Sequence, residues 1–359
     1  MTTPCPTVWI YQPYVPVYRR PFFEGLAQHL RAQGVRLRVR FPDPPLAHSR
    51  GDRAAPASWS EPVPARRVRV AGRTVHLSSA RGVRPGDAVI TGLQATSLDS
   101  WRALTRRRVA RGLWGHVGSY VARPHPTDLA LERWMMRRAD RVFAYTEDGA
   151  ALARRAGARA ITTVMNSVDV SYLDGPRAAL PAAAALAHQE GRPLVAFLGA
   201  LDATKRLDLL AAALEVLASQ GSDLHVLVAG EGPDGARLRP AIARGQVSLL
   251  GYAEGPVKAA VADTCGALVV PGRIGLVAVE ALAMGRPIVT TSTARHAPEA
   301  AYLTPGASLI AADPDPASLA AAMSEASRRP RQQWAHPDLA GMVERMGEGI
   351  VAMLADAAR

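Results

Sequence analysis

The sequence predicts two α/β domains, each built on a parallel sheet that helices cover on both faces. Strand and helix patterns alternate along almost the whole chain, which is typical of such layers. The alternation stops after Asn166 and begins again at Leu194, and 359 residues are enough for about two domains. Two similar layers joined by a linker form a cleft, so we expect two Rossmann-like domains facing a central cleft.

The first domain is expected over residues 1–170. Its strands are short apolar runs, and its helices carry apolar residues three and four positions apart. The Pro- and Arg-rich stretch 42–66 predicts a surface loop, and residues 68–77, interrupted by Ala71-Gly72-Arg73, predict a hairpin. We expect strands at 8–11, 35–41, 88–92, 109–116, 142–146 and 161–165, and helices at 19–32, 98–107, 127–139 and 148–156.

A second alternating pattern predicts another domain over residues 193–333. Residues 171–192 break the pattern and are interpreted as a linker. The tail, residues 334–359, has apolar residues at helical spacing, so we expect a final helix that packs back across the domain interface. The strands of the second domain are expected at 194–199, 224–229, 247–250, 267–270, 288–291 and 308–310.

The charge of the chain is unevenly distributed. Residues 1–180 hold 28 Arg and 13 Asp and Glu, a balance of +15, whereas residues 181–359 have a balance of −3. A basic first half favours an anionic partner such as a phosphate or a lipid headgroup. No nucleic-acid motif accompanies the arginines, so nucleic acid is not the expected partner.

Composition and missing motifs disfavour several functions. No apolar stretch is long enough to cross a membrane, and the N-terminus lacks the order of a signal peptide, so we expect a soluble cytoplasmic protein, with contact at the inner face of the membrane left open. The two cysteines have no metal-ligand spacing, and there is no P-loop, dinucleotide fingerprint or H-E-x-x-H motif. These absences disfavour hydrolysis by a P-loop, dinucleotide redox chemistry and zinc chemistry, so we expect none of these cofactors or metals.

Residues 265–291 form the most informative segment, because they read as a buried strand, a glycine turn, a helix and a second buried strand. At the carboxyl edge of a parallel sheet, such a turn directs the first free N–H groups of the helix at a crevice that suits a diphosphate. Glu280 lies one and a half turns into the helix, within reach of neutral hydroxyls. The combination suggests a nucleotide-sugar site.

Two further segments follow strands at the same expected edge. Gly230-Glu231-Gly232-Pro233 comes after the strand at 224–229, and Lys205 and Arg206 come after the strand that ends at Gly199. Two adjacent cations there can neutralise a diphosphate leaving group. They could instead be solvated residues at the start of a helix.

Three other positions each allow two interpretations. Asn166-Ser167-Val168-Asp169 is either a capped turn or part of the cleft floor. His116 ends a strand and is either structural or a group that contacts a sugar. Glu299 either complements a helix dipole or faces the ligand edge.

These segments together resemble the family 4 retaining glycosyltransferases with the GT-B fold. The run from Gly275 to Pro287 is similar to that family's donor-site signature, and the other segments occur in the family's order. The resemblance implies a nucleotide-diphosphate sugar donor, transfer with retained configuration, and no need for a metal ion. It also implies that Glu280 holds the ribose hydroxyls, Lys205 the diphosphate and His116 the donor sugar.

Three departures from the family pattern concern the site. Gly272 stands where the family commonly has a first glutamate, and Ala200 stands where it has a basic residue, for which Arg206 is a candidate substitute. The glycine-rich loop after the first strand is replaced by a segment that places Tyr14, Tyr18 and Arg19 on the acceptor side. The groups expected to replace the missing glutamate are the side chain of Arg273 or the backbone N–H groups of Gly272, Arg273, Ile274, Gly275 and Leu276.

The function predicted from the sequence is that of a retaining glycosyltransferase, with catalytic candidates His116, Lys205 and Arg206. The acceptor is expected to be a glycan, a lipid or a small molecule bound by the basic first domain. The alternatives are a nucleotide-sugar epimerase of the same fold, and a noncatalytic protein that binds nucleic acid or an anionic membrane surface.

Overall fold

The computed structural model describes residues 5–43, 55–70, 73–78, 81–94, 97–118 and 126–358. Contacts divide the chain into two units. The first unit consists of Met1–Asp169 together with Pro337–Arg359, and the second unit is Val170–His336. Each unit contains its own parallel sheet, as the alternating pattern predicts.

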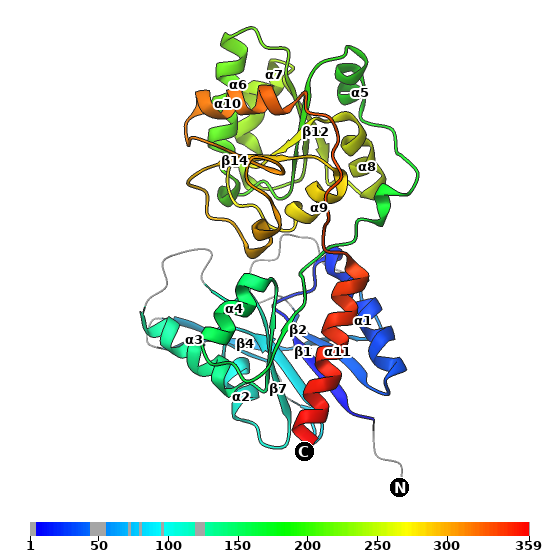
Figure 1. The fold of residues 1–359 in the computed structure, drawn as a ribbon, viewed down its shortest axis with the longest axis vertical. Helices are drawn as coiled ribbons and strands as arrows, with labels where there is room; N and C mark the ends of the chain where they lie inside the picture. The colour runs from blue at the N-terminus through cyan, green and yellow to red at the C-terminus, as the bar shows by residue number, and fades with distance from the viewer. Residues whose placement is uncertain are drawn as a thin grey trace. The chain divides into compact units, whose positions relative to one another are not determined.

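The first unit is built on a seven-stranded sheet of order β3-β2-β1-β6-β7-β8-β9, in which all neighbouring strands are parallel (Figure 1). The central strands are almost fully buried, because helices cover them, and their apolar runs reflect that burial. The strands are β1 (Thr7–Tyr11), β2 (Arg36–Pro42), β3 (Ser60–Val63), β6 (Ala88–Gly92), β7 (Ala110–Gly115), β8 (Arg141–Ala144) and β9 (Ile161–Thr163).

The C-terminal helix completes the first unit. In Figure 1, α11 (Leu339–Ala358) lies beside α1 (Arg20–Ala32), although more than 300 residues separate them in the sequence. Met346 and Ile350 of α11 are fully buried in the same cluster as Phe22 of α1. The other helices of this unit are α2 (Leu98–Thr105), α3 (Pro126–Arg138) and α4 (Glu147–Arg155).

The expected loop at 42–66 contains a strand that the sequence analysis missed. β3 pairs with β2 at the edge of the sheet, where Pro62 is tolerated because one side of the strand needs no hydrogen bonds. The predicted hairpin is present as β4 (Ala65–Val70) and β5 (Arg73–Ser78). Its residues 71–72, like residues 44–54 of the expected loop, lie outside the described residues.

The second unit is built on a six-stranded parallel sheet of order β12-β11-β10-β13-β14-β15. The six strands match the predicted ranges to within two residues. They are β10 (Leu194–Leu198), β11 (His225–Ala229), β12 (Val247–Gly251), β13 (Ala267–Val269), β14 (Ile288–Thr291) and β15 (Leu309–Ala312), and the helices are α5 (Ala182–Gln189), α6 (Leu207–Ser219), α7 (Arg239–Ala243), α8 (Gly255–Thr264), α9 (Val277–Met284) and α10 (Pro316–Ala326).

Residues 171–192, expected as a linker, belong to the second unit. Ala184 and Ala187 of α5 are buried in the same cluster as Leu194. A short 3-10 turn, Ser171–Leu173, packs on α8, where Gly255 is required because a Cβ there would lie 2.6 Å from the Cβ of Tyr172. The segment is therefore packed structure, and it brings Tyr172 close to α8.

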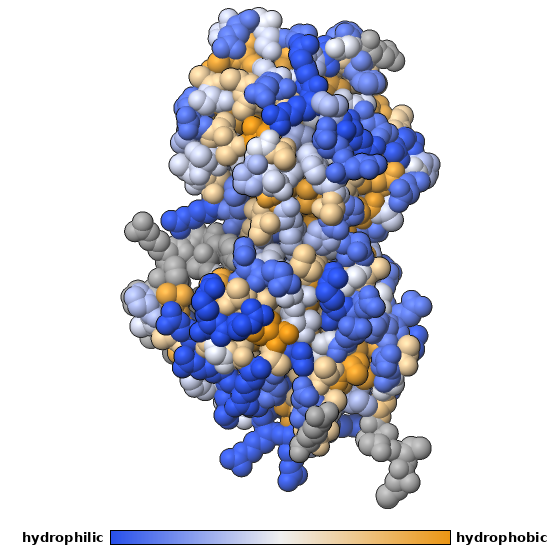
Figure 2. All heavy atoms as spheres, in the orientation of Figure 1, coloured by the Kyte–Doolittle hydropathy of each residue, from blue (hydrophilic) through white to orange (hydrophobic). Residues whose placement is uncertain are grey.

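The two units differ in charge. The first unit carries 29 basic and 16 acidic residues, a net charge of +13, whereas the second carries 14 and 15, a net charge of −1. Hydrophilic residues cover much of the face drawn in Figure 2, with small apolar groups between them. Among the described helices, none combines the length and the apolarity that crossing a membrane requires.

Candidate functional site

The candidate site lies at the carboxyl edge of the second sheet. Strands β10, β11, β13 and β14 are parallel, so the segments that follow them meet at one edge. Together with Arg206 and Glu280, these segments contain the residues singled out from the sequence in this half of the chain. They are Gly199–Lys205, Gly230–Pro233, Pro271–Leu276 and the stretch 292–299.

Two glycines allow the first two of these segments to touch. A Cβ on Gly230 would overlap the carbonyl oxygen of Gly199, and a Cβ on Gly232 would overlap that of Leu201. In addition, the amide of Leu201 donates to the oxygen of Glu231 at 2.9 Å. The G-x-G spacing is therefore needed for the close approach of two turns, and the side chain of Glu231 itself is exposed.

The turn Gly272–Leu276 is fixed on one side by the Lys205 segment. The amide of Gly272 donates to the oxygen of Lys205 at 3.2 Å, and the amide of Arg273 donates to the oxygen of Thr204 at 2.8 Å. The Lys205 side chain, only 8% exposed, donates from Nζ to the oxygen of Arg273. These contacts hold the Lys205 ammonium against the turn, as the position after β10 suggested.

A histidine that sequence reasoning did not select holds the other side of the turn. The amide of Ile274 donates to Nδ1 of His296 at 3.3 Å, and the amide of Ala297 donates to the oxygen of Ile274 at 2.8 Å. Burial lowers the pKa of His296, and the nearby charge of Lys205 lowers it further. His296 is therefore a neutral acceptor at pH 7, and its position after β14 was the available signal.

The contacts of the turn narrow the set of amides that can bind a ligand. Gly272, Arg273 and Ile274 donate their N–H groups to protein acceptors. Within the described part of the chain, the amides of Gly275 and Leu276 have no such acceptor, and both residues are partly exposed at the start of α9. Of the five backbone N–H groups expected to bind a ligand, those of Gly275 and Leu276 are thus the two without a protein acceptor among the described residues.

Packing explains why Gly272 stands where a glutamate is expected. A Cβ at this position would overlap the carbonyl oxygen of Thr204 and would lie 2.8 Å from the Cα of Lys205. Both are backbone atoms, which cannot rotate away. A glutamate at position 272 would therefore require the two turns to separate.

Glu280 is buried among polar groups. This residue of α9 is 8% exposed. Its Oε1 accepts hydrogen bonds from Nζ of Lys258 at 2.8 Å and from the hydroxyl of Tyr172 at 3.2 Å. Burial alone would lower the pKa of Lys258, but the charge and the hydrogen bond of Glu280 outweigh it and raise the pKa. Oε2 of Glu280 accepts no hydrogen bond from the described residues.

Arg206 and Glu299 are less closely connected to the turn. Arg206 is exposed, has a left-handed φ of 55°, and pairs with Asp208 at 3.0 Å. The hydrogen bond from Arg206 lowers the pKa of Asp208. Glu299 is 3% exposed in the 3-10 turn Pro298–Tyr302. Of the adjacent cations, it is Lys205 that contacts the Gly272–Leu276 turn.

The remaining predicted site residues lie in the first unit. His116 is exposed directly after β7, and its ring centroid lies 4.9 Å from that of Tyr145, which follows β8. Arg19 donates to the side-chain oxygen of Asn166 at 2.7 Å, so a residue expected on the acceptor side and one expected at the donor are neighbours. The structure also places Tyr18, 41% exposed, and the partly buried Tyr14 in the segment before α1.

Arg19 is a buried cation surrounded by aromatic rings. It is 8% exposed, and its guanidinium lies 5.5–6.0 Å from the ring centroids of four aromatic residues. Such contacts stabilise a desolvated guanidinium by about 1–2 kcal/mol each. The four rings are those of Tyr18, Phe22, Trp114 and Tyr145.

Comparisons with known proteins find similarity to glycosyltransferases. Residues 192–328 match the family described as glycosyl transferases group 1. Over 215 residues, the chain is 30% identical to the 2-deoxystreptamine glucosyltransferase of Streptomyces kanamyceticus. That match covers 55% of this chain and 53% of the relative, so the similarity spans about half the length of the curated relative.

Solved structures resemble the chain over nearly its whole length. The sucrose-phosphate synthase of Thermosynechococcus elongatus has a TM-score of 0.60 at 17% identity, covering 98% of this chain and 96% of that one. The trehalose 6-phosphate synthase of Burkholderia multivorans has a TM-score of 0.55 at 16% identity, covering 99% and 94%. Anabaena HepE, solved with UDP, has a TM-score of 0.54 at 13% identity, covering 98% of each chain.

At these identities the structural similarities define the fold. The chain has two Rossmann-like α/β units of the kind found in GT-B glycosyltransferases, as the sequence predicted. The described residues contain no cluster of three or more His, Cys, Asp or Glu side chains that could hold a metal ion.

Proposed function

We propose that this chain is a retaining glycosyltransferase that moves a sugar from a nucleoside-diphosphate donor to an acceptor bound by the first unit. The observation that carries the proposal is the Gly272–Leu276 turn, held between Lys205 and His296 with Glu280 on the helix that follows. This arrangement of a cation, free amides and a carboxylate matches the charge pattern of such a donor. The match of residues 192–328 to glycosyl transferases group 1 supports it.

The diphosphate would be held by three features of the turn. The Lys205 ammonium, which donates to the carbonyl of Arg273, would supply positive charge beside the diphosphate. The amides of Gly275 and Leu276 point from the start of α9, where the helix dipole favours an anion. During transfer these groups would stabilise the charge that develops on the departing diphosphate, a role in which one donor is typically worth about 3 kcal/mol. No metal ion is needed in this scheme.

Glu280 would bind the hydroxyls of the nucleoside. Lys258 and Tyr172 hold Oε1, which fixes the orientation of the carboxylate and leaves Oε2 as an acceptor. Burial disfavours the ammonium of Lys258, but the attraction of Glu280 outweighs it and raises the pKa of Lys258, so the cation remains beside the carboxylate. Lys258 and Tyr172 thus act as positioning residues, which hold the acceptor atom in place.

The acceptor side is proposed to lie at the carboxyl edge of the first sheet, where His116 is exposed beside Tyr145. His116 would contact the transferred sugar, as the family resemblance implies. The curated relative is named for a glucosyl transfer to 2-deoxystreptamine, and HepE was solved with UDP, so UDP-glucose and small polyhydroxylated acceptors are the first compounds to test. We propose a cytoplasmic location.

Titration calorimetry with UDP, ADP and GDP tests this proposal. Wild type should bind at least one nucleoside diphosphate, and Glu280→Ala should weaken that binding about fivefold or more, because a hydrogen bond to a neutral partner contributes about 1 kcal/mol. Glu215→Ala is the matched control, since Glu215 is exposed on α6. Equal affinities for wild type and Glu280→Ala would refute the ribose contact.

A further inference from the structure

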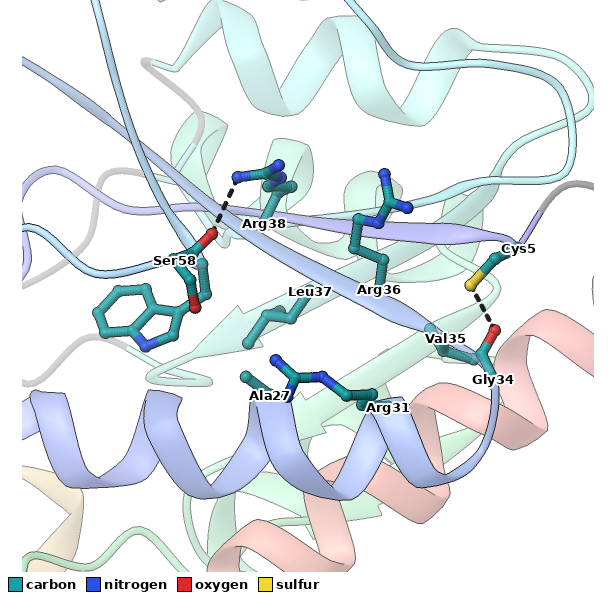
Figure 3. A pocket seen from close by; sticks show the side chains of 10 residues that line it. Cys5, Ala27, Arg31, Gly34, Val35, Arg36, Leu37, Arg38 and Ser58 are labelled. Carbon is teal, nitrogen blue, oxygen red and sulfur yellow. Dashed lines mark hydrogen bonds between the residues drawn. The ribbon is translucent and has the colours of Figure 1, made fainter.

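We propose that the first unit contains a second ligand site, a pocket that binds an organic phosphate through a basic rim and an apolar floor. The pocket has a volume of about 350 Å³. Figure 3 shows the side chains that line it. The proposal does not depend on glycosyl transfer, because the pocket contains none of the residues assigned to the donor or the acceptor. It is lined by Cys5, Ala27, Arg31, Gly34, Val35, Arg36, Leu37, Arg38, Ser58 and Trp59.

The rim of the pocket is strongly basic. Arg31, Arg36 and Arg38 line it, and no acidic residue is among its lining residues. Arg38 donates to the oxygen of Ser58 at 3.0 Å. Arg31 and Arg36 are exposed, and the side chain of neither forms a hydrogen bond or an ion pair within the described parts of the chain. Figure 3 shows Arg36 and Arg38 on one side of β2 and Arg31 on the side of α1, so the arginines border the pocket from both sides. The planar forks of Arg31 and Arg36 have unused donors that match the oxygens of a phosphate.

The floor of the pocket is apolar. Val35 and Leu37 are 6% and 4% exposed, and Trp59 is 4% exposed. A ligand with both a phosphate and an apolar group uses the rim and the floor together, whereas inorganic phosphate uses only the rim.

The pocket lies at the edge of the first sheet opposite to the proposed acceptor side. Arg36, Leu37 and Arg38 begin β2, and Arg31 lies in the last turn of α1. His116 and Tyr145, in contrast, follow the carboxyl ends of β7 and β8. A seven-residue strand spans about 20 Å, so a ligand in this pocket leaves the carboxyl edge accessible. The pocket is therefore a separate site within the first unit.

Phenyl phosphate is a suitable soluble probe, because its ring matches the floor and its phosphate the rim. Calorimetry should show saturable binding to wild type, and Arg31→Gln/Arg36→Gln should weaken it at least tenfold. The matched control is Arg154→Gln/Arg155→Gln, which removes two exposed arginines from α4 and should bind phenyl phosphate as wild type does. Inorganic phosphate should bind at least fivefold more weakly than phenyl phosphate.

Vesicles distinguish the two sources of such a ligand. If the natural ligand is a lipid headgroup, wild type should sediment with phosphatidylcholine vesicles that contain phosphatidic acid. The Arg31→Gln/Arg36→Gln variant should then stay in the supernatant. Binding of phenyl phosphate without vesicle retention identifies a soluble phosphoester. The proposal is overturned if phenyl phosphate does not saturate wild type, if both double variants bind it equally, or if inorganic phosphate binds equally well.

Discussion

Gly272 lies where the backbones of two turns meet, and it is the departure from the family pattern that packing explains. A side chain there would overlap the carbonyl oxygen of Thr204. The same contact places Lys205 against the turn. The close packing of the two turns therefore explains both why position 272 has no glutamate side chain and why the Lys205 ammonium lies near the turn. In the proposed donor site, the amides of Gly275 and Leu276 would take the role expected for a glutamate.

Gly272→Ala should lower the free energy of unfolding by about 1–3 kcal/mol, because the new Cβ must displace backbone atoms. The control is Gly275→Ala in the same turn, whose Cβ would meet only the Cβ of Ala297, at an ordinary distance of 3.9 Å. Urea unfolding followed by circular dichroism measures both. Equal midpoints for the two variants would contradict the packing account.

His296 gives the second unit a dependence of stability on pH. Its pKa is lowered in the folded protein, so the unfolded chain takes up a proton first as the pH falls through the ordinary pKa of 6.5. The free energy of unfolding should therefore decrease below about pH 6.5. His296→Asn keeps an acceptor for the amide of Ile274 but does not titrate, so its stability should decrease less between pH 7.5 and 5.5.

His225 should remain as a second source of this dependence in the His296→Asn variant. Burial lowers its pKa as well, and its ring nitrogens lie 3.0 Å from the oxygen of Gly245 and 2.8 Å from the hydroxyl of Ser248. The decrease in the free energy of unfolding with falling pH should thus be smaller in the variant than in wild type, but it should not disappear. Identical urea midpoints against pH in wild type and His296→Asn would show that His296 titrates as it does in the unfolded chain.

Among the elements, α11 shows how a segment distant in sequence completes a core. Its glycines differ in their surroundings. A Cβ on Gly349 would lie 2.6 Å from Oγ1 of Thr162 and 2.8 Å from the ring of Phe143, whereas a Cβ on Gly341 would meet only the end of the flexible Arg345 side chain at 3.0 Å. Close packing against β8 and β9 therefore requires glycine at one position and not at the other.

Gly349→Ala should destabilise the first unit by about 1–3 kcal/mol despite the better helix propensity of alanine. Gly341→Ala should be neutral or stabilising by up to about 1 kcal/mol, because only propensity changes. Thermal unfolding monitored by tryptophan fluorescence compares them. Equal stability of Gly349→Ala and Gly341→Ala would contradict the claim that packing leaves no room for a Cβ at position 349.

The sequence predicted most elements because buried parallel strands are short apolar runs that local composition reveals. The prediction missed β3, because Pro62 indicates a loop when only the local sequence is considered. Proline is tolerated there because β3 is an edge strand. The glycines and Lys205 of the site were identifiable from their places after strands. Tyr172 and Lys258 were not, because each acquires its role from a partner more than 20 residues away in the sequence. His296 also follows a strand, but its contact with Ile274 could not be read from the sequence.

At the scale of the whole molecule, the two units have separate sheets and separate cores. Five of the six tryptophans lie in the first unit and only Trp334 lies in the second, so fluorescence reports mainly on the first unit. The proposed donor binds the second unit. Ligand binding should thus stabilise one unit more than the other.

A nucleoside diphosphate at about 100 times its Kd should stabilise the second unit by roughly 2.7 kcal/mol. The transition seen by circular dichroism but not by fluorescence should shift to a higher urea concentration, while the fluorescence transition stays in place. A shift confined to the fluorescence transition would place the ligand in the first unit and contradict the assignment.

Hydrogen exchange with and without a saturating nucleoside diphosphate tests the central claim most directly. The account predicts slower exchange in peptides covering the Gly272–Leu276 turn, above all at the amides of Gly275 and Leu276, which have no acceptor among the described residues. Glu280→Ala should reduce that protection at equal ligand concentration. Unchanged exchange in this turn while the ligand is bound, with slowing elsewhere, would contradict the account.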